Sequence, residues 1–263
     1  MQITNNKTNP TFGYGITRHI ATEISECDVS KVTKKFREYN IPTNFNNNKV
    51  FAYCSLKCLE IIQFLNSKYK LNLSLPNGIY VDNFKKLDIE INNAFGLTNL
   101  APSTVYRNND VIYPEQSIFF NDSQCTAEEF DEQADKLWAA KLQPSAFFLT
   151  PILHEFSHVI HNENLVNTLG GMEYIKRVLS RKIPSAQIPL IQKNICEYAG
   201  TDTFEAVACD ISKRIVDNLD KKKLVPTANP LKNSPYREYN ILEKLLLHSE
   251  FDKIMHKFWR GNF

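Results

Sequence analysis

The chain lacks several features that would place it in common functional classes. No apolar run approaches the roughly 20 residues that a helix needs to cross a bilayer. The polar start, Met1–Asn6, does not resemble a secretory signal peptide. An excess of charge of one sign is also missing, because 31 basic side chains stand against 29 acidic ones. We therefore expect no membrane span and no nucleic-acid partner, and a protein that is cytoplasmic or secreted without a classical signal peptide.

A disulfide framework is absent as well. The six cysteines show no compact spacing; they are Cys27, Cys54, Cys58, Cys125, Cys196 and Cys209. A chain of 263 residues with 43% hydrophobic content can bury a sizeable core without cross-links, so we expect reduced thiols. Cys54 and Cys58 lie one helical turn apart, but no second pair completes a four-ligand zinc site. Both are expected to pack in the core.

The apolar pattern predicts an α+β protein with two regions. Residues 1–100 form a mixed N-terminal accessory lobe, and residues 101–263 form a mainly helical region with a small antiparallel sheet. The two regions could also be one continuous domain. In the first region the pattern predicts a helix over Val29–Tyr39, a strand over Val50–Tyr53 and a helix from Ser55 to about Tyr69.

In the second region, short strands are expected between residues 103 and 121. One of them, Ser117–Phe120, is either an edge strand that pairs with an extended peptide or an ordinary buried strand. Thr126 and Glu129 form a capping box that opens a helix to about Lys141. Its predicted inner face is Phe130, Ala134, Leu137 and Trp138. Further helices are predicted near residues 173–181, 188–198, 203–218, 236–248 and 251–259.

The most informative segment is His154-Glu155-Phe156-Ser157-His158, an H-E-x-x-H motif within an apolar run. Four residues along a helix bring two side chains onto one face, so His154 and His158 can reach one zinc ion. Glu155 then lies beside the water that the metal binds. This is the ligand geometry of a metallopeptidase.

The motif lies in a predicted helix from Pro151 to about Asn162, with Thr150 as its N-cap. Apolar residues cover nearly the whole circumference of this helix, namely Ile152, Leu153, Phe156, Val159 and Ile160. Such a helix is buried in a core, and buried imidazoles need partners. The partner is a metal ion or, in the alternative interpretation, a backbone hydrogen-bonding group.

Hydrolytic zinc keeps three protein ligands and one open position. His161 shares a helical stripe with His154 but lies further along the axis, so we expect it to be structural or to support the site from outside. The segment after the motif lacks the Gly-then-His arrangement of metzincins, and Gly200-Thr201-Asp202 only half matches an Asp-ligand class. Glu205 is the strongest candidate, in the first turn of a helix capped by Asp202. The same spacing reads equally well as a capping box.

With Tyr198 seven residues before Glu205, this region resembles the anthrax lethal factor-like clan of gluzincins, which includes the Pro-Pro endopeptidases. The resemblance covers roughly residues 147–215, about a quarter of the chain. It implies a zincin-like fold and the zinc ligands His154, His158 and Glu205. It also implies that Glu155 is the general base and that Tyr198 donates a hydrogen bond to the transition state.

The chain departs from the family pattern four residues after Glu205. Family members usually carry an acid there that orients a zinc-bound histidine, whereas this chain has Cys209. Asp210 follows one place later and points about 100° further around the helix. Orientation of the histidines is therefore expected from another element, or activity is low.

These observations predict a zinc-dependent endopeptidase in which Glu155 activates a zinc-bound water. The resembling family is rich in secreted toxins and effectors. The resemblance thus implies a bacterial protease that acts on a specific host or partner protein and is delivered into a host cell. Two alternatives remain open, a catalytically inactive zincin-fold interaction module and a structural zinc module without turnover.

Overall fold

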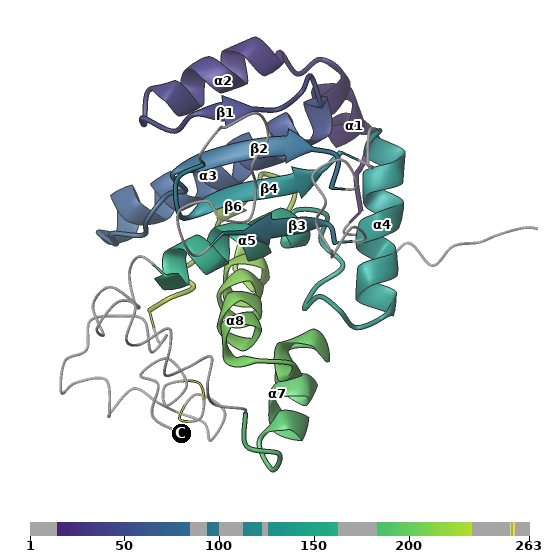
Figure 1. The fold of residues 1–263 in the computed structure, drawn as a ribbon, viewed down its shortest axis with the longest axis vertical. Coiled ribbons are helices and arrows are strands. Elements are labelled where there is room, and N and C mark those ends of the chain that lie inside the picture. The colour runs from purple at the N-terminus through teal and green to yellow at the C-terminus, as the bar shows by residue number, and fades with distance from the viewer. Residues whose placement is uncertain are drawn as a thin grey trace, which may run out of the picture.

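The computed structural model describes residues 15–84, 94–99, 113–122, 126–162 and 183–232, together with Lys253 and Met255. This part of the chain is mixed α/β, with more helix than strand. Figure 1 shows a central sheet, with α2 on the side of β1 and with α8 and α7 on the side of β3. The helices are α1 (Arg18–Ser25), α2 (Val29–Arg37), α3 (Lys49–Tyr69), α4 (Ala127–Ala139), α5 (Thr150–Ile160), α7 (Ile188–Asn194), the 3₁₀ helix η2 (Tyr198–Gly200) and α8 (Thr203–Asp217). No described helix is long and apolar enough to cross a membrane.

The main sheet has the strand order β1-β2-β4-β3. Its strands are β1 (Thr43–Asn44), β2 (Gly78–Asp82), β3 (Gly96–Thr98) and β4 (Ser117–Asn121), and a separate hairpin pairs β5 (Leu219–Asp220) with β6 (Val225–Pro226). The β1–β2 and β2–β4 pairs are parallel, and only β3 runs antiparallel, against β4. The main sheet is therefore mixed: the expectation of an antiparallel sheet holds for the β3–β4 pair and the β5–β6 hairpin, and is wrong for the β1–β2 and β2–β4 pairs. The connections from β1 to β2 and from β2 to β4 are long enough to return the chain to the same end of the sheet.

The strand predicted at Ser117–Phe120 is confirmed as β4, but it does not lie at an edge. It is hydrogen-bonded on one side to β2 and on the other to β3, and all five of its residues are buried. The interpretation as an ordinary buried strand is right. Within the described sheet, the edge next to β4 is β3.

The strand predicted over Val50–Tyr53 is wrong, because these residues form the first turns of α3. Asn48 caps this helix, and its side-chain oxygen accepts a hydrogen bond from the Phe51 N–H at 3.0 Å. The Phe51 ring stacks on Phe120 of β4 with 4.9 Å between ring centroids. Helix α3 is buried on most sides, so residues with a high strand propensity pack well in it. Tertiary packing thus outweighs the strand propensity of these residues.

Helices α2 and α4 lie where the sequence predicts them. The capping box is present at Thr126 and Glu129. Phe130 and Ala134 are buried, but Trp138 is 43% exposed and does not belong to the inner face. The last turn of α4, which ends at Ala139, is therefore largely exposed to solvent.

Two predicted boundaries differ in the region of the motif. Helix α5 begins at Thr150, so Thr150 is its first residue rather than its cap, and the Thr150 N–H donates to the Phe147 carbonyl instead. Helix α7 ends at Asn194, and Tyr198 lies in η2. The predictions for residues 103–112, 173–181 and 236–248, and most of 251–259, lie outside the described residues, although Lys253 and Met255 are helical.

One hydrophobic core joins the N-terminal helices to α5 and α8. It includes Phe36 of α2, Leu59 of α3, Leu153 of α5 and Val207 of α8, each with no exposed surface. The core therefore crosses the boundary expected near residue 100. Cys54 and Cys58 are fully buried in it, as predicted, and the described cysteines are free thiols. Helix α8 packs extensively against α5, and this contact builds the site.

Candidate metal centre

The site forms where the first turn of α8 meets the middle of α5. The Asp202 side chain caps α8 by accepting hydrogen bonds from the N–H groups of Phe204 at 2.8 Å and Glu205 at 3.0 Å. This cap fixes the start of the helix and aims the Glu205 side chain at α5. His154 and His158 share one face of α5, and their side chains are only 15% and 11% exposed. Only the Asp202 half of the expected capping box is therefore present, and the Glu205 carboxylate lies at the histidines of α5 instead.

Three ligand atoms converge between these helices. The Nε2 atoms of His154 and His158 are 3.1 Å apart. Glu205 Oε2 lies 3.0 Å from His154 Nε2 and 3.5 Å from His158 Nε2. Tetrahedral zinc with bonds of about 2.0–2.1 Å separates its ligand atoms by roughly 3.3 Å. The observed spacing therefore fits a zinc ion, and the described residues hold no other such group of three or more ligands.

The charges of these groups compensate one another in the metal-free protein. Burial alone would lower the pKa of His158, but the Glu205 carboxylate outweighs it and raises this pKa to about 9. Burial works in the opposite direction on Glu205, where the two imidazoles hold the pKa of the carboxyl well below its ordinary value. The cluster thus favours a positive charge beside a carboxylate. A divalent cation can replace that proton.

Glu155 lies on α5 between the two histidines and is 7% exposed. Its Oε2 atom accepts a hydrogen bond of 2.8 Å from the Thr98 hydroxyl, on strand β3. The Glu155 carboxylate contributes to the raised pKa of His158, so it lies within electrostatic reach of the cluster. Sequence reasoning missed Thr98, which is 57 residues away along the chain and belongs to no motif.

Tyr198 lies near His154, in η2 just before α8. Its ring centroid is 6.1 Å from that of His154. Burial, followed by the charges of Glu205 and Glu155, raises the pKa of Tyr198 above its ordinary value. The phenol therefore keeps its proton at neutral pH and can donate a hydrogen bond.

Cys209 lies on α8, one turn after Glu205. Its Sγ lies 3.6 Å from Nδ1 of His154, and Cys196 Sγ lies 3.7 Å from Cys209 Sγ. Helix α8 itself, rather than another element, thus contacts the outer nitrogen of His154. Asp210 points elsewhere, as expected, and forms an ion pair with Arg214 at 2.9 Å. A thiol binds an imidazole N–H more weakly than a carboxylate does.

His161 does not belong to the group of ligands. It has no exposed surface, and its ring centroid lies 5.3 Å from that of Phe204. Burial lowers the pKa of His161 to about 3, so its ring is neutral. This environment fits the structural role expected from the sequence.

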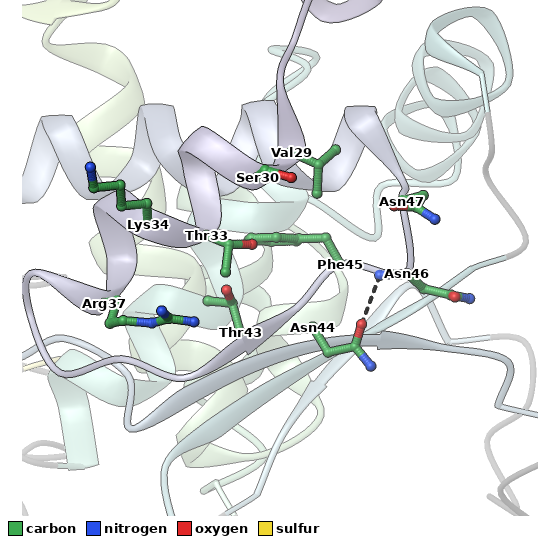
Figure 2. Close-up of a pocket in the computed structure, with 10 residues that line it drawn as sticks. All are labelled: Val29, Ser30, Thr33, Lys34, Arg37, Thr43, Asn44, Phe45, Asn46 and Asn47. Atoms are coloured by element: carbon green, nitrogen blue, oxygen red, sulfur yellow. Dashed lines mark hydrogen bonds between the residues drawn. The ribbon is translucent and has the colours of Figure 1, made fainter.

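A hollow of about 430 Å³ lies elsewhere, between α2 and β1. Figure 2 shows Lys34 and Arg37 of α2 on one side and Thr43 and Asn44 of β1 on the other. None of the residues that line it is an acid, a histidine or a cysteine. It therefore has no set of metal ligands, and its elements carry none of the residues of the metal centre.

No protein-family model, curated protein sequence or solved structure matches the chain. Two imidazoles and one carboxylate leave one position of a tetrahedral ion open, with a buried carboxylate and a phenol nearby. Such an arrangement can activate water against a carbonyl.

Proposed function

We propose that the protein is a zinc-dependent endopeptidase of the gluzincin type. The observation that carries the proposal is the convergence of His154, His158 and Glu205 within zinc-ligand distance, with Glu155 on the same helix. A purely structural zinc site would be closed by a fourth protein ligand, and the described residues offer three. The open position is the reason for preferring catalysis.

When bound, zinc lowers the pKa of a coordinated water to roughly 7 and polarises the substrate carbonyl. His154, His158 and Glu205 would hold the ion. Glu155 accepts the proton of the attacking water and delivers it to the leaving amine. The Tyr198 phenol donates a hydrogen bond to the oxyanion that develops on the carbonyl oxygen.

The substrate would be an extended peptide segment of a protein. Strand β3 lies at the edge of the described sheet and packs beside α5. Its outer backbone groups suit pairing with such a segment, which would pass close to the metal centre. The resemblance to the lethal factor-like clan favours a specific host or partner protein as the target.

The first experiment measures metal content and peptide cleavage on the same purified protein. Elemental analysis should find one zinc per chain, and mass spectrometry of a peptide library should find cut products. Glu155→Gln should retain zinc and lose about 100-fold or more of the activity, because it removes the general base. Glu205→Gln should lose both zinc and activity. The exposed Glu128 on α4 provides the matched control, and Glu128→Gln should change neither.

A second variant tests the phenol. Tyr198→Phe should retain zinc and lower kcat by about 100-fold, the usual effect of removing one oxyanion donor. Zinc-free native protein would contradict the metal site. Zinc-loaded protein that cuts no peptide would leave an inactive or structural module instead.

A further inference from the structure

Two residues of strand β3, Gly96 and Thr98, lie beside Glu155 of α5, the proposed general base. Gly96 and Thr98 are two positions apart, so both face the same side of the strand, which is the side of α5. Leu97 faces the other side, where it packs against the small cluster of Phe84 and Phe119. Both residues on the α5 side of this three-residue strand therefore lie against the Glu155 side chain.

The Thr98 hydroxyl is the polar part of this contact. It donates to Glu155 Oε2 at 2.8 Å and also lies 3.2 Å from the Glu155 backbone carbonyl. Thr98 is 9% exposed, and its partner in the sheet register is the fully buried Ile118. A hydroxyl on a buried strand has little freedom, so the carboxylate that it binds is held in one orientation.

Gly96 is the steric part. A Cβ at this position would lie 3.0 Å from Glu155 Cγ and 3.2 Å from Glu155 Cδ. It would also lie 3.1 Å from a ring carbon of Phe120. The Glu155 side chain thus uses the space that a side chain at position 96 would fill. Phe120 is buried and stacked on Phe51, so the strand cannot easily move aside.

We propose that Thr98 is a positioning residue for the general base, and that Gly96 provides the room for it. This inference rests on the proposed function. Thr98 binds the Oε2 atom of Glu155, which leaves Oε1 to accept the proton of the attacking water. The hydroxyl acts through Glu155 and touches no zinc ligand. Its loss should therefore impair turnover more than metal binding.

Two variants of Thr98 separate the hydroxyl from the shape of the side chain. Thr98→Val keeps the volume and removes the hydroxyl, and it should lower kcat by about 10- to 100-fold with zinc content and KM unchanged. Thr98→Ser restores the hydroxyl and should recover most of the native kcat. Gly96→Ala is an independent perturbation, expected to lower kcat because it displaces the Glu155 side chain. Thr22→Val removes an exposed hydroxyl on α1, outside the site and outside β3; it is the matched control and should keep native kcat.

A native kcat in Thr98→Val, or equal loss in Thr98→Val and Thr98→Ser, would overturn the inference. Thermal unfolding identifies a variant that fails to fold, in which case Gly96→Ala and Thr98→Ser carry the test. Crystal structures of native protein and Thr98→Val give a readout that needs no activity. The Glu155 carboxylate should move away from β3 in the variant, and an unmoved carboxylate refutes positioning even if the native protein cleaves no peptide.

Discussion

Zinc binding to the metal-free protein should displace about one proton at pH 7.5, and this proton should come from His158. The Glu205 carboxylate raises the pKa of His158 to about 9 against the effect of burial. At pH 7.5 this imidazole is therefore mostly protonated. Zinc binds only the neutral ring, so the proton must leave.

The pKa of His158 also sets how strongly zinc affinity depends on pH. Well below pH 9 the apparent zinc affinity should rise about tenfold per pH unit, and the total rise between pH 7 and pH 9 should be about 50-fold. Above pH 9 the contribution of His158 should level off. Competition with a chelating dye of known pH dependence measures this profile. Calorimetry at pH 7.5, in buffers of different ionisation enthalpy, counts the protons released.

Glu205→Gln provides the comparison, because it removes the charge that holds the proton on His158. The pKa of His158 should then fall, because burial lowers it and the largest opposing charge is gone. At zinc concentrations high enough to saturate the weakened site, fewer protons should be released at pH 7.5 than from native protein. A pH-independent affinity with no proton release from native protein would refute the reasoning.

The raised pKa of His158 also makes the stability of the metal-free fold depend on pH. A histidine whose pKa is raised in the folded state stabilises that state below its unfolded pKa of about 6.5. The contribution is then lost as the pH rises through about 9. The metal-free protein should therefore lose stability between pH 6.5 and pH 9, as urea unfolding can measure.

Three further variants test other parts of the structure. Cys209→Ala removes the thiol near His154 Nδ1 and should weaken zinc binding about tenfold, whereas Cys209→Ser should weaken it less; dye competition distinguishes them. Asp202→Ala removes the cap of α8 and should lower the free energy of unfolding by about 1 kcal/mol in urea titration. Phe51→Ala removes the ring stacked on Phe120 and should cost about 3–5 kcal/mol in the same assay, and a loss below 1 kcal/mol would contradict a shared core.

Local patterns were the reliable part of the sequence prediction. The capping box at Thr126 and the cap at Asp202 act within a few residues, and both appear in the structure. The strand expected over Val50–Tyr53 is wrong, because the segment is buried on most sides as part of α3. In such a buried segment, tertiary packing determines whether the residues form a helix or a strand, and intrinsic propensity is only a weak guide.

The sequence by itself determined that His154 and His158 lie on one face of a helix, because the helical period places residues four apart side by side. It could not decide between ligation and capping for Glu205, since both use the same spacing. Only the packing of α8 on α5 brings the Glu205 carboxylate to within 3.0 Å of His154. The contact from Thr98 to Glu155 and the position of β3 at the sheet edge were likewise decided by tertiary structure. They join segments far apart along the chain, and no local period relates such segments.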